Sequence, residues 1–303
     1  MTSVEKYNLA AIDIGSNATR LLIKTVDKDV DGNIHLSKTL FLRVSLRLGD
    51  EVFVNGEISE EKEKQFIRVM KSYKYLMKAY DVKSYRACAT SAMRDAKNGK
   101  TILKKIEKKT DVKIEIISGE EESQIIYDNH LNMMQKKGNY LYVDVGGGST
   151  ETTFINNDQR ISSVSYNVGT VRMLSGMVDE KIYNEMKDDL AEITSGYPDV
   201  NIVGSGGNIN KLFRIAPKKD KTGNSFTVES LEKLYTQLNR MSVEERMETY
   251  GFKSDRADVI VPAAEIFLSI AKRSEERRVG KECTSWCRSR WSPYRRERTS
   301  SGA

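Results

Sequence analysis

The sequence predicts an α/β protein built from two domains of related topology with a cleft between them. Three observations favour this fold class. The chain of 303 residues is too long for one small core and long enough for two domains of ordinary size. Strand-like and helix-like segments alternate along it. A strand, a small polar turn and a second strand near the N-terminus recur in the middle of the chain, which indicates a duplicated domain.

The first half opens with this strand–turn–strand pattern. The apolar run 9–14 ends in the turn Asp13-Ile-Gly-Ser-Asn, and a second apolar run follows at 19–26, which predicts a hairpin. Residues 59–78 are expected to form a helix because their apolar side chains recur at spacings of three and four. The next expected elements are a strand at 82–89, a helix at 98–109, a strand at 112–117 and a helix that begins at Ser118.

The second half repeats the opening pattern. The run 140–144 ends in Asp144-Val-Gly-Gly-Gly-Ser-Thr, and a strand-like run follows at 151–155. Asp13 and Asp144, which lie 131 residues apart, occupy equivalent positions of this repeat. The remaining expected elements are a strand at 201–203, a third glycine-rich turn at 204–207, a helix at 209–214 and a helix at 259–271.

The glycine-rich turns predict an anion-binding site. Gly and Ser after a strand let backbone N–H groups approach a ligand closely, and several such groups favour phosphate. One turn alone is more often only a hairpin, but three in one chain favour the functional interpretation. Asp13 and Asp144 suit the two sides of a Mg²⁺ site because this ion prefers carboxylates, phosphates and retained waters. The alternative is that each Asp caps its own turn.

Three acidic residues, Glu120, Glu121 and Glu122, supply a candidate for catalysis. Ser118 and Glu121 match a capping box, and the macrodipole favours acids at a helix N-terminus, so a well-capped, solvated helix start also explains them. The functional interpretation needs a carboxylate near the terminal phosphate that orients a water and accepts its proton.

Composition narrows the class of protein. Hydrophobic residues at 39% and charged residues at 30% are typical of a soluble globular protein. No apolar run approaches the roughly 20 residues that a membrane span requires, and the first residues lack a secretory pattern, so a cytoplasmic location is expected. The three cysteines, Cys88, Cys283 and Cys287, make neither a disulfide framework nor a four-ligand metal set.

The segment 273–303 differs sharply in composition from the rest. It holds both tryptophans and nine Arg or Lys residues against four Glu, so most of the net charge of +6 lies there. An arginine-rich nucleic-acid arm and a disordered appendage are two interpretations. A third is preferred, because the runs 273–283 and 288–294 resemble sequencing-adapter DNA translated in frame. The segment is therefore expected to be a non-native tail, and no nucleic-acid partner is expected.

An ordered set of motifs resembles the exopolyphosphatase and guanosine pentaphosphate phosphatase (Ppx/GppA) family over residues 8–272. The resemblance implies an α/β fold of two duplicated actin-like (ribonuclease H-like) domains with a cleft that holds Mg²⁺. It implies a magnesium-dependent phosphohydrolase that releases terminal phosphate from inorganic polyphosphate or guanosine pentaphosphate. The motifs are Ile12-Asp-Ile-Gly-Ser-Asn17, Thr90-Ser-Ala-Met-Arg94, Ile116-Ile-Ser-Gly-Glu-Glu-Glu122, Val143-Asp-Val-Gly-Gly-Gly-Ser-Thr-Glu151 and Gly204-Ser-Gly-Gly207.

The resemblance also implies roles for single residues. Glu122, the last acid of its run, would be the catalytic carboxylate. Asp144, Gly146 and Glu151 would surround the metal. Phosphate oxygens would be held by Ser16, Asn17, Arg94, Gly147, Gly148, Ser149, Gly206 and Gly207. The planar fork of Arg94 can hold two oxygens at once, and the alternative for Arg94 is a surface ion pair.

The expected division is an actin-like domain I at 1–128, with the first phosphate loop and the catalytic helix, and an actin-like domain II at 129–272, with the other two loops. Two features depart from the family. Ser123 stands where the family usually has Ala. The closing strand and last helix of the shorter family members are replaced by the tail 273–303, which predicts a truncated domain II with an exposed strand edge and a lower stability.

Other functions stay open from the sequence alone. An actin-like ATPase or small-molecule kinase shares the Asp-x-Gly turns, although the segment 118–123 argues against it. A truncated form that only binds polyphosphate would follow if the missing ending is essential. The expected partner is a polyphosphate or guanosine polyphosphate substrate, without membrane contact, and a homodimer is left open. Basic residues that could line a polyanion groove, or simply be solvated, are Arg20, Arg43, Arg47, Arg172, Lys211 and Arg214.

Overall fold

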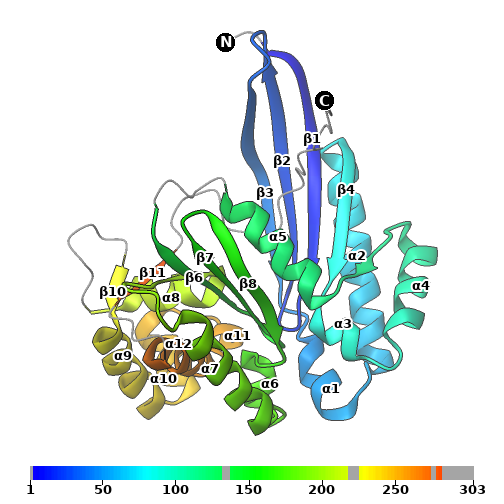
Figure 1. Ribbon diagram of the computed structural model, residues 1–303. Coiled ribbons are helices and arrows are strands. Elements are labelled where there is room, and N and C mark those ends of the chain that lie inside the picture. The colour runs from blue at the N-terminus through cyan, green and yellow to red at the C-terminus, as the bar shows by residue number, and fades with distance from the viewer. Residues whose placement is uncertain (1–2, 132–136, 218–224, 274–277, 282–303) are drawn as a thin grey trace.

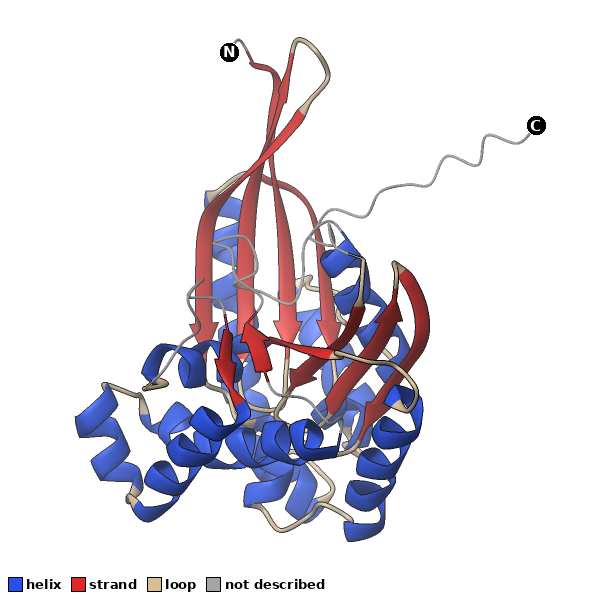
Figure 2. Cartoon of the chain, turned by 60° about the vertical axis from the view of Figure 1, so that its left-hand side comes forward, coloured by secondary structure: helices blue, strands red, loops and turns tan. Residues whose placement is uncertain are grey.

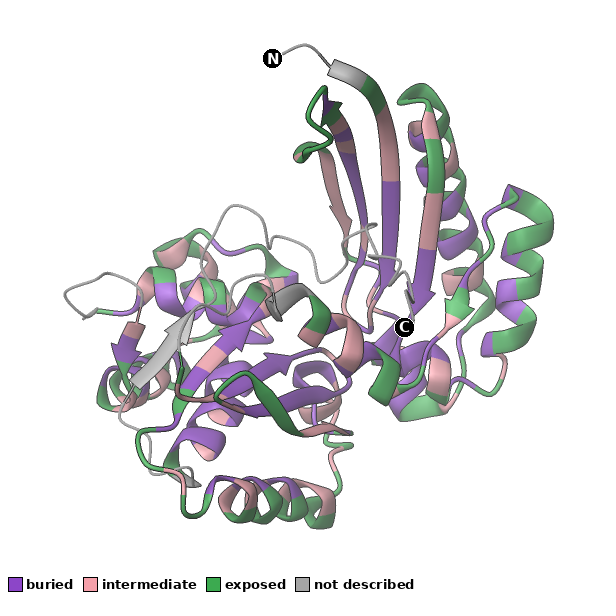
Figure 3. Cartoon of the chain, turned by 45° about the horizontal axis from the view of Figure 1, so that its top comes forward, coloured by how far each residue is buried: buried purple, intermediate pink, exposed green. Residues whose placement is uncertain are grey.

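The computed structural model describes residues 3–131, 137–217, 225–273 and 278–281 and contains two β-sheets with helices packed around them (Figure 1). The long strands of the first sheet rise above the rest of the molecule, and the second sheet lies beside their lower ends (Figure 2). Buried residues concentrate on the strands, and exposed residues lie on the outer sides of the helices (Figure 3). The predicted α/β class is confirmed.

The first sheet has five strands in the order β3-β2-β1-β4-β5. β1 is antiparallel to β2 and β2 to β3, whereas β4 is parallel to both β1 and β5. The predicted hairpin is confirmed at the centre of this sheet, and its strands extend beyond the apolar runs that predicted them. The strands are β1 Ser3–Ile14, β2 Thr19–Asp29, β3 Ile34–Val44, β4 Val82–Ala89 and β5 Glu115–Ile116.

The second sheet has six strands in the order β10-β11-β9-β6-β7-β8. β6 is antiparallel to β7 and β7 to β8, whereas β9 is parallel to both β6 and β11. β10 pairs with β11 in the antiparallel direction at the edge. The strands are β6 Asn139–Val145, β7 Thr150–Asn156, β8 Gln159–Tyr166, β9 Asn201–Ser205, β10 Ser225–Thr227 and β11 Arg278–Lys281.

The two sheets share one topology, since β3-β2-β1-β4-β5 corresponds strand by strand to β8-β7-β6-β9-β11. The turns after the first strand of each half also agree. The N–H of Gly15 donates to the carbonyl of Ala18 over 3.1 Å, and the N–H of Gly146 donates to that of Ser149 over 2.9 Å. These two pairs are 131 positions apart, so the duplication predicted from the sequence repeat is confirmed.

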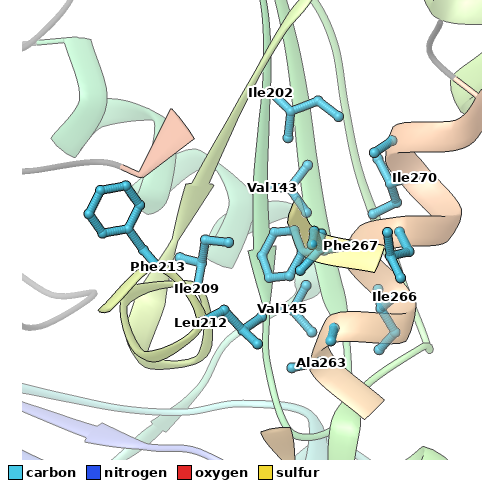
Figure 4. Packing of buried hydrophobic residues seen from close by; sticks show 14 of the residues in the cluster. Val143, Val145, Ile202, Ile209, Leu212, Phe213, Ala263, Ile266, Phe267 and Ile270 are labelled. Carbon is cyan, nitrogen blue, oxygen red and sulfur yellow. The ribbon is translucent and has the colours of Figure 1, made fainter. Parts of the chain in front are cut away.

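Each sheet packs its own apolar core against helices. Ile12 and Ile14 of β1 belong to one cluster with Phe66 and Met70 of α2, where the predicted stripe of apolar residues is buried. Val143 and Val145 of β6 belong to the other cluster, which is closed by residues of α8 and α12 (Figure 4). Because side chains alternate along a strand, Asp13 and Asp144 between these apolar pairs point away from the cores.

The helices of the first half are α1 Leu48–Asn55, α2 Glu60–Ala79, α3 Ser91–Asp95, α4 Gly99–Thr110 and α5 Gly119–Leu131. Those of the second half are α6 Thr170–Leu174, α7 Glu180–Thr194, α8 Gly206–Ile215, α9 Val228–Arg240, α10 Val243–Tyr250, α11 Ser254–Ala257 and α12 Ile260–Arg273. Within the described ranges, none of these helices combines the length and the apolarity needed to cross a bilayer.

The position of β11 corrects one expectation. The tail was predicted to leave the second sheet without its closing strand, but residues 278–281 form β11 beside β9, at the place that β5 holds in the first sheet. The predicted unpaired edge of the second sheet at β9 is therefore wrong, and the lower stability stays a prediction. The foreign origin of the tail stays a prediction, and residues 282–303 lie outside the described part of the chain.

Helix α5 links the two halves. Ile125 of α5 packs with Ala11 of β1 and Ile117 in the first half, while the helix also lies against β7 and β8 of the second sheet. α5 runs through residue 128, where the sequence predicted the division between domains, so the helix belongs to both halves by its contacts. The predicted domain limits stay a prediction.

Candidate active site

The loop after β1 and the equivalent loop after β6 touch each other where the two sheets meet. A Cβ atom added to Gly147 would lie 3.1 Å from Ser16 Cβ and 3.2 Å from Asn17 N. A Cβ atom added to Gly148 would overlap Ser91 Oγ and would lie 2.8 Å from Ser16 Oγ. The hydroxyls of Ser16 and Ser91 share a hydrogen bond of 2.8 Å. Glycine at both positions permits this close backbone approach.

A row of charged residues crosses the first sheet beside these loops. The strand register places Asp13 opposite Arg20, and Arg20 opposite Arg43, so all three share one face of the sheet. Asp13 is buried and accepts a hydrogen bond from Arg20, while its Oδ1 atom is buried with no hydrogen-bond partner. Arg43 pairs with Asp255, in α11 of the second half. This row, which we call the cationic row, contributes two guanidinium groups.

The equivalent row of the second sheet carries the opposite charge. The register places Asp144 opposite Glu151, and Glu151 opposite Ser165. Both carboxylates are 2% exposed. Glu151 Oε1 accepts hydrogen bonds from Ser149 Oγ at 2.5 Å and from Ser165 Oγ at 3.1 Å. Glu151 takes the position that Arg20 holds in the first half, 131 residues earlier, so this acidic row places two carboxylates side by side.

The predicted third glycine-rich turn, 204–207, is instead the direct junction of β9 and α8, and it lies between the acidic row and another arginine. Gly206 has φ +86°, and a Cβ atom there would lie 2.9 Å from Asp144 Oδ1. A Cβ atom on Gly207 would lie 2.9 Å from Arg256 Nη2. A side chain at either position would therefore meet the carboxylate or the guanidinium, and the backbone at the start of α8 lies close to both.

Arg256 adds a third guanidinium to the two of the cationic row. It extends from α11 and donates a hydrogen bond to Asn208, whose amide donates to the carbonyl of Val145 at 3.1 Å. Burial, together with repulsion from Arg43 and Arg20, lowers the pKa of Arg256 to about 10. The group is still protonated at neutral pH. The repulsion on Arg256 from Arg43 and Arg20 favours an anion near Arg256.

A narrow cleft opens between these groups, with a volume of about 30 Å³. Its walls come from both halves of the chain. They are formed by Gly15, Ser16, Asn17, Ala18, Arg20, Arg43, Thr90, Ser91, Val145, Gly146, Gly147, Ser149, Thr170, Gly207, Asn208 and Arg256.

Glu122 lies in the first turn of α5 and is fully buried. Its Oε2 atom accepts a hydrogen bond of 3.1 Å from Arg94 Nη1, which also donates to the carbonyl of Ile117 at 2.9 Å. The start of α5 lies against the acidic row, because a Cβ atom on Gly119 would be 2.7 Å from Ser165 Oγ. Glu122 and Arg94 thus lie next to the acidic row and outside the walls of the narrow cleft.

The predicted capping box at the start of α5 forms only in part. The N–H of Glu121 donates to Ser118 Oγ at 3.0 Å. The carboxylate of Glu121 instead accepts a hydrogen bond of 2.7 Å from Arg86 of β4. The three acids of this turn therefore differ in surroundings, since Glu120 and Glu121 are exposed and Glu122 is buried.

The donor set suits a hard divalent cation that takes few protein ligands. In the described ranges, no group of three or more His, Cys, Asp or Glu side chains is close enough to hold a metal by itself. Asp144 and Glu151 offer two buried carboxylates side by side, and Asp13 offers a buried oxygen without a hydrogen-bond partner. Mg²⁺ is commonly held by one or two carboxylates, with waters and substrate phosphates completing its shell. These residues fit such an ion.

The structure brings most of the predicted site residues together. Six predicted residues line the cleft: Ser16, Asn17, Gly146, Gly147, Ser149 and Gly207. Asp13 and Glu151 are bonded to wall residues, and Asp144, Gly148 and Gly206 are chain neighbours of wall residues. The roles given to these residues, and to Glu122 and Arg94, stay predictions.

Among the basic candidates, Arg20 and Arg43 line the cleft, but Arg172 does not serve as a groove residue. It donates to the carbonyl of Gly148 at 2.9 Å, pairs with Asp95 at 2.5 Å and lies 4.0 Å over the Phe53 ring. These contacts tie the loop after β6 to the first half.

Sequence reasoning missed Ser91, Asn208 and Arg256 as cleft residues. Asn208 directly follows the third glycine-rich turn, and Ser91 lies within the motif 90–94, so adjacency could have identified both. Arg256 follows no glycine-rich turn, and only the packing of α11 reveals its place.

Comparisons with known proteins agree with this geometry. A sequence model of the Ppx/GppA phosphatase family matches residues 25–280. A bifunctional 3-dehydroquinate synthase/phosphatase of Fusobacterium nucleatum is 34% identical over 196 residues, which cover 61% of this chain and 29% of that protein. Exopolyphosphatase 1 of Mycobacterium bovis is 25% identical over 278 residues, which cover 84% of this chain and 79% of that protein.

A guanosine-5'-triphosphate,3'-diphosphate pyrophosphatase of Aliivibrio fischeri is 25% identical over 275 residues, covering 86% of this chain and 54% of that protein. Among solved structures, the Ppx/GppA protein of Aquifex aeolicus superposes with a TM-score of 0.70 and 26% identity, covering 91% of this chain and 94% of the other. The fold is thus the two-part actin-like fold that the sequence predicted.

Proposed function

The chain belongs to the Ppx/GppA phosphatase family, whose members hydrolyse phosphoric anhydride bonds, and from this premise we propose that it releases terminal phosphate from inorganic polyphosphate or guanosine pentaphosphate with the aid of Mg²⁺. One observation carries the proposal. Equivalent positions of the two halves hold opposite charges, Arg20 in the cationic row and Glu151 in the acidic row, beside one cleft with glycine-rich walls. Such a site suits a metal-bound chain of phosphoryl groups.

The anionic chain would be held mainly by the cationic row and the loops. Arg20, Arg43 and Arg256 line the cleft, and a polyanion would relieve the repulsion that Arg43 and Arg20 exert on Arg256. The backbone N–H groups of Gly147 and Gly207 would add neutral donors in a concave wall. This preference for several adjacent negative charges favours a polyphosphate substrate over a singly charged ester.

The acidic row would hold the metal ion. Asp144 and Glu151 would bind it directly or through water, with Asp13 reaching it from the other half. A bound Mg²⁺ would supply charge stabilisation as the phosphorus–oxygen bond to the leaving group breaks. Asp144 and Glu151 would fix the position of the bound cation, because their carboxylates are buried and side by side.

Glu122 would orient the attacking water and accept its proton. Arg94 donates to its carboxylate at 3.1 Å and thereby stabilises the charge of the proposed base. Glu122 is fully buried in the described conformation and lies outside the walls of the cleft. Productive binding would therefore separate the halves along the contacts of α5 and expose Glu122 to the terminal phosphate.

The test is a phosphate-release assay with Mg²⁺ run in parallel on long-chain polyphosphate, guanosine pentaphosphate and ATP. The proposal expects release from one or both of the first two at a rate well above that from ATP. Comparable ATP turnover that requires an added acceptor would instead identify a kinase of the same fold. Retention of polyphosphate without phosphate release would contradict the proposal and identify a binding protein.

A further inference from the structure

Ser165 occupies a position between the proposed metal site and the helix that carries the proposed base. It lies on β8, directly opposite Glu151 of β7, so the two side chains share one face of the sheet. Ser165 Oγ donates to Glu151 Oε1 at 3.1 Å, and Ser149 Oγ donates to the same oxygen at 2.5 Å. Two hydroxyls on one oxygen fix the rotation of this buried carboxylate.

The other side of Ser165 touches the start of α5. A Cβ atom added to Gly119 would lie 2.7 Å from both the Cβ and the Oγ atoms of Ser165 and 4.0 Å from Arg94 Nη2. Gly119 stands three residues before Glu122, a spacing that places both on one side of the helix. Ser165 therefore lies against the turn that presents Glu122, without a gap that another side chain could fill.

We propose that Ser165 is a positioning residue that orients Glu151 toward the metal and sets the distance between Glu151 and the first turn of α5. This inference rests on the proposed function, because it assumes that Glu151 holds the metal and that Glu122 acts on the substrate. The corresponding position of the first half holds Arg43, whose cation serves the substrate side. A small hydroxyl at this point of the acidic row instead supports an anion without neutralising it.

The expected size of the effect follows from the behaviour of groups that support metal ligands. Their loss typically reduces metal affinity or activity by about 10- to 100-fold. Ser165→Ala removes one donor from Glu151 Oε1 and leaves the Ser149 donor in place, so the lower end of this range is expected. The packing against Gly119 is retained because the Cβ atom stays.

Ser163 offers a matched control on the same strand. It lies two residues earlier on β8, on the same face, and shares a hydrogen bond of 3.0 Å with Thr153, the next residue of β7 on that face. Both serines are partly buried. Ser163→Ala removes the same kind of cross-strand hydroxyl contact without touching Glu151, and it reports what such a loss does to the sheet alone.

The experiment measures the Mg²⁺ concentration that gives half of the full thermal stabilisation by Mg²⁺ alone, for the parent chain and for both variants. Ser165→Ala is expected to raise it about 10-fold, and Ser163→Ala to leave it within 2-fold. The same shift is expected in the Mg²⁺ dependence of phosphate release, with kcat restored at high Mg²⁺. Equal Mg²⁺ concentrations for half stabilisation of Ser165→Ala and Ser163→Ala would overturn the inference. A parent chain that Mg²⁺ does not stabilise would also overturn it.

A separate outcome concerns the proposed function. If the parent chain releases no phosphate but Mg²⁺ stabilises it, the Mg²⁺ concentration for half of the full stabilisation still decides the role of Ser165 toward Glu151. If Ser165→Ala fails to fold, Ser165→Cys keeps the side-chain size and weakens the donor. That variant is expected to raise the Mg²⁺ concentration for half stabilisation by a smaller factor. An unchanged concentration would overturn the inference.

Discussion

Gly148→Ala tests the close approach of the two loops. An added Cβ atom would overlap Ser91 Oγ and would lie 2.5 Å from the Phe53 ring and 2.8 Å from Ser16 Oγ. These neighbours cannot move independently. The two serine hydroxyls are bonded to each other at 2.8 Å, and the Phe53 ring is held under the guanidinium of Arg172 at 4.0 Å. The loop after β6 must therefore shift away from the loop after β1.

The cost of this shift follows from two general magnitudes. Forcing an extra carbon into a well-packed site typically costs about 1–3 kcal/mol, and for a chain of this size each kcal/mol lowers Tm by about 2–4 °C. A displacement of about 1 Å in substrate-positioning groups reduces catalysis by about 10²-fold. Gly148→Ala is therefore expected to lower Tm by several degrees and kcat/KM for polyphosphate by about two orders of magnitude.

The assays are a thermal melt and steady-state phosphate release with Mg²⁺. Gly176→Ala is the control, because nothing lies within 4 Å of its added Cβ atom and only its φ of +66° opposes the change. That strain costs about 1–2 kcal/mol and lies outside the cleft walls, so the control is expected to lose stability and keep kcat/KM. A Gly148→Ala variant with the kcat/KM of the parent chain would refute the reasoning.

Two further predictions concern buried titratable side chains. Glu122→Gln keeps the size of the side chain but removes the proposed proton acceptor, so turnover should fall by about 10²- to 10⁴-fold with substrate binding retained. Glu120 is exposed, so Glu120→Gln should behave like the parent chain. Near-normal turnover of Glu122→Gln would remove Glu122 from this role. Burial raises the pKa of Tyr73 to about 12 from an ordinary value of 10.0, so the folded state disfavours the phenolate. The contribution of the protonated Tyr73 to the free energy of unfolding is present below pH 10 and is lost as pH rises from 10 toward 12. Tyr73→Phe should therefore show a shallower loss of stability over this range in denaturant unfolding, and an identical slope would contradict the assignment.

Much of the fold could be predicted because the signals are local. The hairpins follow from apolar runs around Gly-Ser turns, and the duplication follows from the spacing of Asp13 and Asp144. The stripe that contains Phe66 and Met70 predicted the buried face of α2 for the same reason. Ends of strands were less predictable. β1 and β2 extend beyond their apolar runs because pairing with each other continues where burial declines.

The parts of the site that could not be predicted depend on tertiary contacts. Arg256 reaches the cleft only through the packing of α11. Arg172, for which the sequence left a groove or solvent open, instead holds Gly148 and Asp95. The contrast between the two rows also needed the strand register, which places Glu151 where the first half has Arg20. β11 is the converse case, because the replacement of the family's closing strand by the tail 273–303 predicted an unpaired strand edge, and residues 278–281 pair with that edge.

The most direct test of the central claim is anomalous diffraction from crystals soaked with Mn²⁺, which takes oxygen ligands as Mg²⁺ does. The account predicts a single strong peak beside the carboxylates of Asp144 and Glu151, on the side that faces Arg20, and loss of that peak in Asp144→Asn. A peak elsewhere with the acidic row empty, or a peak unchanged in Asp144→Asn, would contradict it.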